Sequence, residues 1–126
     1  MSRGAAVVLL VEDDVDSREM LAMWLELDGF RVLQAGNGEE ALRVLAEAGV
    51  PRPAMILLDL EMPVMDGERF REIQEHDTEI GRIPVAWISA SPRVEEVAAR
   101  HGTLPVLRKP CDVEAVSALI DDAAAS

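Results

Sequence analysis

The chain lacks several residue types on which whole classes of protein depend. It contains no Tyr among its 126 residues, and aromatic residues make up 3% of it. Its one cysteine, Cys111, has no second cysteine with which to form an intramolecular disulfide. No Gly-x-Gly-x-x-Gly or Gly-x-x-x-x-Gly-Lys-Ser/Thr motif is present, so a flavin carrier or a nucleotide-dependent enzyme is a weak hypothesis.

Basic residues are scarce relative to acidic ones. The chain has 12 Lys and Arg against 24 Asp and Glu, a net charge of −12. Proteins that bind a phosphate backbone need a basic face, so neither nucleic acid nor an anionic membrane is an expected partner. The apolar run Ala5–Val11 has seven residues, too few to cross a bilayer, and no Ala-x-Ala cleavage site follows it. We therefore expect a cytoplasmic protein.

The residues that are present favour one globular domain over 1–126. Hydrophobic residues make up 49% of the chain and charged residues 29%. Five short apolar runs alternate with stretches of helical spacing, and the runs are nearly continuous in Val, Ile and Leu, as in strands buried on both faces. This alternation predicts an α/β fold, a parallel sheet with helices on both sides. The predicted strands are Ala5–Val11, Phe30–Ala35, Met55–Leu58, Val85–Ile88 and Val106–Leu107.

Five helices are predicted from caps and periodicity. Asn37, with Glu40 three residues later, predicts the start of the second helix, which ends near Gly49. The other predicted helices are Asp16–Asp28, Glu68–His76, Ser91 to about Arg100, and Asp112 to about Ala123.

Polar residues follow four of the five predicted strands. In an open α/β sheet the ligand site lies at the carboxyl ends of the strands. These residues are Glu12, Asp13 and Asp14 after the first strand, Asp59 after the third, Ser89 after the fourth and Lys109 after the fifth. Each alone has an ordinary explanation, because acids favour helix starts, serine is a common cap and lysine is usually a solvated charge. Together they predict a cluster, since adjacent strands lie about 4.8 Å apart.

A cluster of carboxylates repels itself unless a cation offsets the charge. Oxygen ligands without His or Cys nearby favour Mg²⁺. We predict that His76 and His101, at helix ends, lie on the surface, and that Cys111 is a small residue at a helix start.

The motifs at these strand ends resemble the receiver domain of two-component response regulators, and chemotaxis receivers in particular. The most specific is the string Met55-Ile-Leu-Leu-Asp59-Leu-Glu-Met62-Pro63-Val-Met65-Asp66-Gly67. Glu12-Asp13-Asp14, Ile88-Ser89-Ala90 and Arg108-Lys109-Pro110 agree in order and spacing. The resemblance covers about residues 7–120 and implies a flavodoxin-like sheet in the order 2-1-3-4-5.

The resemblance also implies a function. Asp59 is expected to accept a phosphoryl group from a phosphohistidine on a sensor histidine kinase or a histidine phosphotransfer protein, and the domain is not an enzyme that acts on other substrates. Glu12, Asp13, Asp59 and the backbone carbonyl of Glu61 are the implied Mg²⁺ ligands. Lys109 and Ser89 are expected to contact the phosphoryl oxygens, and the face built by the fourth and fifth helices is expected to bind a target or a second copy.

The sequence departs from the family at Val106. Most members carry Tyr or Phe three residues before the conserved lysine position, and this ring turns inward on activation. Valine has one stiff side-chain torsion and cannot move in that way. The segment from 102 to 105 also departs from the family's pattern. Glu61 and Ser91, two places after the phosphoacceptor and the hydroxyl residue, are expected to flank the path of a hydrolytic water and to tune the lifetime of the phosphoryl group. A receiver-like domain that binds its partner without switching therefore stays open as an alternative, as does, more weakly, a Mg²⁺-dependent phosphatase.

Overall fold

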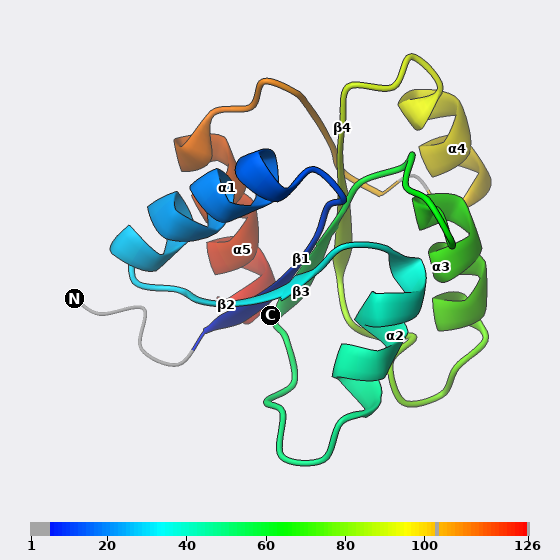
Figure 1. The fold of residues 1–126 in the computed structure, drawn as a ribbon, viewed down its shortest axis with the longest axis horizontal. Helices are drawn as coiled ribbons and strands as arrows, with labels where there is room; N and C mark the ends of the chain where they lie inside the picture. Colours follow the sequence, from blue (N-terminus) through cyan, green and yellow to red (C-terminus); the bar gives the residue numbers. More distant parts are fainter. Residues whose placement is uncertain (1–5, 103, 126) are drawn as a thin grey trace.

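A computed structural model describes residues 6–102 and 104–125, in which five parallel strands form one sheet in the order β2-β1-β3-β4-β5 (Figure 1). This confirms the predicted α/β fold and its strand order. The strands are β1 (Val7–Val11), β2 (Arg31–Ala35), β3 (Met55–Leu58), β4 (Val85–Ser89) and β5 (Val106–Arg108). The helices are α1 (Val15–Leu27), α2 (Gly38–Ala46), α3 (Gly67–Glu75), α4 (Val94–Arg100) and α5 (Val113–Ala125). Ala5, predicted to open the first strand, lies outside the described residues.

Helices cover both faces of the sheet, with α1 and α5 on one side and α2, α3 and α4 on the other (Figure 1). Side chains alternate along the strands, so that Val8 and Leu10 pack with α1 and α5, while Leu9 and Val11 pack with the other three helices. Every residue of β1, β3 and β4 is buried, as their uninterrupted apolar sequences predict. β2 lies at an edge and is more exposed.

The helix starts follow the local capping chemistry. Asp14 caps α1 by accepting a hydrogen bond from the Ser17 amide at 2.9 Å, and Asn37 caps α2 through the Glu40 amide at 2.9 Å. Asp66 does the same for α3. The Glu40 side chain reaches back to the amide of Gly36 rather than to that of Asn37, so the predicted capping box closes one residue further upstream.

Two helices are shorter than their patterns predict. α2 ends at Ala46 instead of near Gly49, because Glu47 is already extended and Gly49 has a φ of 85° ahead of two prolines. α4 begins at Val94 instead of Ser91. Ser91 to Arg93 form a turn, in which the Ser91 hydroxyl accepts a hydrogen bond from the Arg93 amide at 3.2 Å.

His101 corrects the prediction that both histidines lie on the surface. His76 is exposed, but the side chain of His101 is only 7% exposed. It follows the last turn of α4 and lies against α3, where its ring contacts two glutamates. The sequence carried no signal for this, because the glutamates are 26 and 33 residues away.

No helix within residues 6–102 and 104–125 combines the length and the apolar character that crossing a membrane requires.

Candidate functional site

Acidic side chains from two adjacent strands meet at the carboxyl edge of the sheet. Glu12 directly follows β1 and Asp59 directly follows β3, and the Asp59 amide donates a hydrogen bond to the Val11 carbonyl at 3.0 Å. One carboxylate oxygen from each of Glu12, Asp13 and Asp59 lies within 4.8 Å of the other two. Glu12 and Asp59 are buried, whereas Asp13 is exposed to solvent. The cluster is therefore open on one side.

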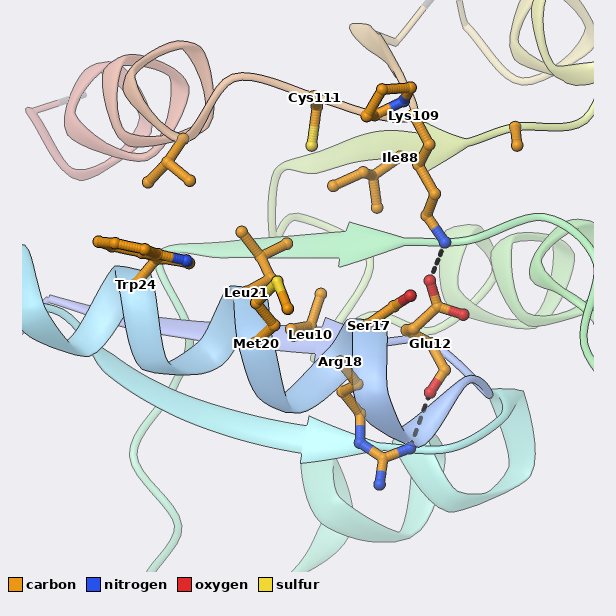
Figure 2. A pocket seen from close by; sticks show the side chains of 13 residues that line it. Leu10, Glu12, Ser17, Arg18, Met20, Leu21, Trp24, Ile88, Lys109 and Cys111 are labelled. Atoms are coloured by element: carbon orange, nitrogen blue, oxygen red, sulfur yellow. Dashed lines mark hydrogen bonds and ion pairs between the residues drawn. The ribbon is translucent and has the colours of Figure 1, made fainter.

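Lys109 brings a positive charge to these carboxylates from the end of β5. Its Nζ lies 2.9 Å from Oδ2 of Asp59 and also contacts Oε1 of Glu12, as Figure 2 shows for the latter. The Lys109 amide donates to the Ser89 carbonyl at 3.1 Å, which ties its backbone to β4. Lys109 is the single lysine of the chain. The structure thus joins residues 12, 59 and 109, which are far apart in the sequence.

The electrostatics of Asp59 reflect its position. Burial raises the pKa of the Asp59 carboxyl to about 6, and the nearby charges of Asp13 and Glu61 act in the same direction. Hydrogen bonds from the Leu60 amide, at 2.7 Å, and from Ser89 partly oppose this rise. Burial also lowers the pKa of Lys109. A raised pKa means that the neighbouring groups of the protein do not fully stabilise the negative charge of ionised Asp59.

Asp14 takes no part in the acidic cluster and caps α1 instead. Its amide donates to Oε2 of Glu12 at 3.0 Å, which orients the Glu12 side chain. Arg18, one turn into α1, donates to the Glu12 carbonyl at 2.8 Å (Figure 2). Arg18 was not singled out in the sequence, since an arginine four residues after a helix cap is ordinary there.

The loop after β4 connects to the loop after β3. The Ser91 hydroxyl donates a hydrogen bond to the Glu61 carboxylate at 2.8 Å, and the Ser91 amide donates to the Ser89 hydroxyl at 3.0 Å. The sequence places Glu61 and Ser91 near the same edge of the sheet but does not reveal the bond between them. Val106 is half-buried and packs against the hydrophobic core beside α4.

The loop from Asp59 to Gly67 is tightly constrained. The Gly67 amide donates to the Leu60 carbonyl at 2.8 Å, and a Cβ at position 67 would lie 2.1 Å from the Asp59 carbonyl oxygen. Val64 has a φ of 69°, a conformation that a β-branched residue rarely adopts. Any side chain at position 67 would therefore clash with the backbone of Asp59, which explains why the string Met55–Gly67 ends in glycine.

A largely apolar pocket of about 490 Å³ lies beside Glu12 and Lys109, between α1 and the segment that joins β5 to α5 (Figure 2). Met20, Leu21 and Trp24 of α1 form one wall. The exposed large hydrophobic side chains of the described residues are concentrated on this helix. They are Val15, Met20, Met23, Trp24 and Leu27 on α1, with Val64 elsewhere.

Comparisons with known proteins identify the family of this chain. The family model of the response regulator receiver domain matches residues 8–121. The chain is 33% identical to the regulatory protein AtoC of Escherichia coli over 119 residues, which are 92% of this chain and 24% of that protein. It is 35% identical to the transcriptional regulatory protein GlrR of Escherichia coli over 126 residues, 98% of this chain and 27% of that protein. The chain therefore spans about a quarter of the length of these relatives.

Solved structures show the same architecture. The receiver domain of a signal transduction histidine kinase from Syntrophus aciditrophicus superimposes with a TM-score of 0.82 at 28% identity, covering 94% of this chain and 89% of that one. The chemotaxis protein CheY4 of Vibrio cholerae gives a TM-score of 0.82 at 27% identity, covering 95% and 99%. On the matched sequence, the strand order and the acidic edge of its sheet, the chain belongs to the response regulator receiver domains, which are regulatory phosphoacceptor modules of two-component signalling and not enzymes in the usual sense.

Proposed function

We propose that this chain acts as one receiver domain, with its core over residues 7–120, in which Asp59 accepts a phosphoryl group from a phosphohistidine. The observation that carries the proposal is the convergence of Asp59, Asp13, Glu12 and Lys109 at one edge of the sheet. If each of these four residues had a separate structural role, their side chains would have no reason to lie together.

The transfer is a substitution at phosphorus. A carboxylate oxygen of Asp59 forms a bond to phosphorus, the bond from phosphorus to the histidine nitrogen breaks, and its electron pair stays on the imidazole, which takes up a proton from solvent. Because burial raises its pKa to about 6, Asp59 is still mostly ionised at neutral pH and is more basic than an ordinary aspartate. Such a carboxylate is a suitable nucleophile for a reaction that depends mainly on alignment and charge neutralisation.

Lys109 and Ser89 supply positive charge and a hydrogen-bond donor. The Lys109 ammonium already contacts Asp59 and has three donors, so it can follow the negative charge onto a phosphoryl oxygen. Ser89 ends β4 next to Asp59 and its hydroxyl can donate to another phosphoryl oxygen. Both groups act in a partly buried site, where electrostatic interactions are stronger than in water.

The donor set fits a hard divalent cation. Three carboxylates lie within reach of one another, no thiol or imidazole is among them, and Asp59 is incompletely compensated. We propose that Glu12, Asp13, Asp59 and the backbone carbonyl of Glu61 hold Mg²⁺, Asp13 most directly because it is exposed. Bound Mg²⁺ would neutralise charge on the phosphoryl oxygens. Glu12 is already engaged by Lys109 and by the Asp14 amide, so it would hold the ion less directly than Asp13.

The partner is a sensor histidine kinase or a histidine phosphotransfer protein. Its histidine must come within bonding distance of Asp59, so the partner must cover the surface beside that residue. The exposed apolar face of α1 and the pocket next to Lys109 provide such a surface. An exposed patch of this kind on a small domain is typical of a binding site.

Phosphorylation is proposed to change the α4 and α5 face through Ser89. Ser89 is joined to Ser91, and Ser91 to Glu61, so a shift of the Ser89 hydroxyl toward a phosphoryl group would disturb the turn that precedes α4. The alternative is a receiver-like domain that binds a partner without switching. Val106 favours this alternative, since no aromatic side chain stands where the family has one.

Phosphodonor labelling tests the proposal. After incubation with Mg²⁺ and acetyl phosphate, intact-protein mass spectrometry should show a gain of one phosphoryl group that is lost on treatment with hydroxylamine, which cleaves acyl phosphates. No gain with acetyl phosphate or with a phosphohistidine donor would instead support the non-switching alternative. Continuous hydrolysis of added phosphoesters would indicate a phosphatase.

Mg²⁺ is expected to stabilise the fold. An ion that binds the native acids and not the unfolded chain adds about 1.4 kcal/mol at ten times its dissociation constant, which corresponds to a rise of about 3–8 °C in Tm for a domain of this size. Thermal melts in Mg²⁺ and in a Na⁺ buffer of equal ionic strength would measure it. The Asp13→Asn chain should lose most of the increment, and an equal Tm in both buffers for the wild type would argue against the metal site.

Lys109→Ala is expected to impair both transfer and stability. Loss of the ammonium leaves the nearly buried carboxylates of Glu12 and Asp59 facing each other, at a cost of about 2–3 kcal/mol without Mg²⁺. Phosphorylation should slow by about 10²–10³. Urea unfolding with and without Mg²⁺, together with labelling rates, would separate the two effects. Arg43→Ala removes an exposed positive charge on α2 and should change neither.

A further inference from the structure

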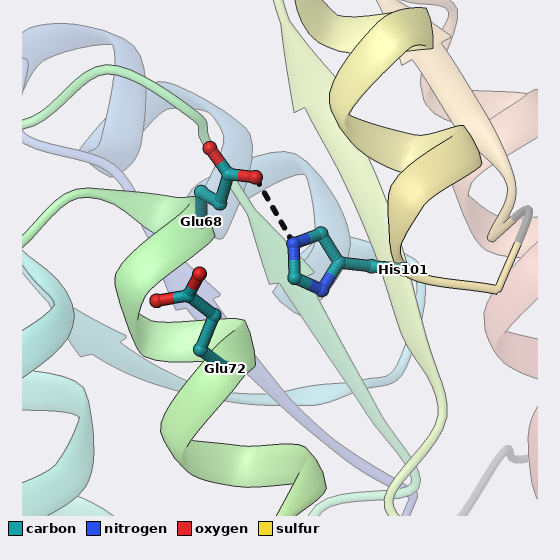
Figure 3. A group of neighbouring side chains, drawn as sticks. All are labelled: Glu68, Glu72 and His101. Atoms are coloured by element: carbon teal, nitrogen blue, oxygen red, sulfur yellow. Dashed lines mark hydrogen bonds and ion pairs between the residues drawn. The ribbon is translucent and has the colours of Figure 1, made fainter.

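A second group of ionisable side chains lies between α3 and the end of α4, outside the acidic cluster around Asp59. Glu68 and Glu72 occupy successive turns of α3, and His101 faces them from the end of α4 (Figure 3). One ligand atom from each of the three lies within 4.8 Å of the other two. Glu75, one turn further along α3, contacts the same imidazole ring. The proposed phosphorylation chemistry uses none of these residues.

The two carboxylate contacts of His101 cannot both be hydrogen bonds donated by a neutral imidazole. Its Nδ1 lies 3.1 Å from Oε1 of Glu75, and its Nε2 lies 3.1 Å from Oε2 of Glu68. Ionised carboxylates only accept hydrogen bonds, whereas a neutral imidazole has one N–H and one lone pair. With the His101 side chain only 7% exposed, a lone pair facing a carboxylate is costly. A proton or a metal ion at the second nitrogen would remove this cost.

The arrangement matches the surroundings of metal-binding histidines. Such a histidine donates one ring N–H to a carboxylate, which fixes the ring and leaves the other nitrogen free to bind the metal. The Nδ1–H of His101 can donate a hydrogen bond to Glu75, which leaves the lone pair of Nε2 facing Glu68, with Glu72 close by. We propose that His101 Nε2, Glu68 and Glu72 form a site for a divalent transition metal of the Zn²⁺ type, with Glu75 as a positioning residue.

The ligand types and the exposure of the site support this assignment. One imidazole and two carboxylates favour Zn²⁺ over Mg²⁺, and three protein ligands leave a position for water. The Glu72 side chain is 44% exposed, so an ion has access from solvent. A bound ion would join α3 to the end of α4, the helix whose position the proposed switch changes.

Arginines compete for the same carboxylates. Arg100 donates to Glu68 at 3.0–3.2 Å, and with His101 it holds the pKa of Glu68 below its usual range although burial opposes this. Arg69 pairs with Glu72 at 3.4 Å, and Arg71 lies 3.9 Å from Glu75. The Arg100 side chain is 47% exposed and also reaches Glu96, so it can leave Glu68 when a metal binds. Removing Arg100 should therefore tighten metal binding.

The test is Zn²⁺ binding by a full chain that carries Asp13→Asn and Asp59→Asn, so that the phosphorylation site does not contribute. Calorimetry should show one Zn²⁺ per chain, and Zn²⁺ should raise the Tm. In ¹⁵N NMR spectra the Nε2 resonance of His101 should shift while Nδ1 keeps its proton. Glu75→Gln should weaken binding by about 10–100-fold, and Arg100→Ala should strengthen it.

Glu72→Gln discriminates between the metal site and a protonated histidine, because Glu72 offers a ligand atom without a hydrogen bond to His101 in the structure. It should abolish the Zn²⁺ effect on Tm and leave the metal-free stability nearly unchanged. Glu39→Gln, which removes another exposed helical glutamate paired with an arginine, should bind Zn²⁺ like its parent chain. The proposal is overturned if Zn²⁺ leaves the Tm unchanged, if its effect survives Glu72→Gln, or if both nitrogens of His101 stay protonated in excess Zn²⁺.

Discussion

Asp59→Asn is expected to take up no phosphoryl group from acetyl phosphate and Mg²⁺, whereas the wild-type chain gains one. An amide has almost the shape of the carboxylate but does not act as the nucleophile in this reaction. Among the carboxylates of residues 6–102 and 104–125, Asp59 alone combines contact with Lys109, a hydrogen bond from Ser89 and a place directly after β3. No other acid of the cluster can therefore replace it. Intact-protein mass spectrometry measures the result.

The same substitution should stabilise the metal-free fold. Since the pKa of Asp59 in the folded state is about 6, above its ordinary value of 3.8, the ionised carboxylate at neutral pH disfavours the folded state. Its removal is expected to add about 1–2 kcal/mol to the free energy of unfolding, reduced by the loss of the contact with Lys109. Asp66→Asn is the matched control, because Asn also caps helices and residue 66 lies on the same loop. That variant should label normally, and labelling of Asp59→Asn at the wild-type level would place the phosphoacceptor elsewhere.

Gly67→Ala is expected to destabilise the domain by about 3 kcal/mol or more. The added methyl group would lie 2.1 Å from the Asp59 carbonyl oxygen and 2.9 Å from Cζ3 of Trp87. Trp87 is fully buried in the centre of the sheet and cannot move aside without displacing the core. The backbone of Asp59 must shift instead, so phosphorylation of the remaining folded protein should slow as well.

Urea unfolding of Gly67→Ala beside Gly36→Ala would measure this effect. A Cβ at position 36 would make only ordinary contacts, 3.5 Å from Nη1 of Arg18 and 3.7 Å from Oε2 of Glu40, so that variant is expected to stay within about 0.5 kcal/mol of the wild type. An equal midpoint for Gly67→Ala and the wild type would mean that the loop from Asp59 to Gly67 is less tightly packed than the structure indicates.

Local and periodic features of the sequence predicted most of the fold. Buried strands such as Met55–Leu58 show as short apolar runs, and Asn37 caps α2 through the neighbouring Glu40 amide. These patterns involve residues no more than a few positions apart, so they can be read from the chain. The C-terminal end of α2 and the start of α4 were predicted less well, because turn chemistry at Glu47 and Ser91 prevailed over helical spacing.

The sequence predicted which residues form the candidate site and which strands they follow. It did not predict the contacts between their side chains. That Asp59 follows a central strand is a property of the sequence pattern together with the family resemblance. The contact of Lys109 with both Glu12 and Asp59, and the bond between Ser91 and Glu61, depend on side-chain conformations across 97, 50 and 30 residues of sequence.

For this protein, the sequence by itself determined the succession of strands and helices along the chain, the cap of α2 at Asn37 and the set of polar residues at the carboxyl ends of the strands, since each depends on short-range spacing and on the alternation of apolar residues. Only the tertiary structure decided that His101 is buried between Glu68 and Glu75, and that the apolar side chains of α1 remain exposed. Both outcomes depend on how whole helices pack against each other and the sheet, and no short stretch of sequence encodes that packing.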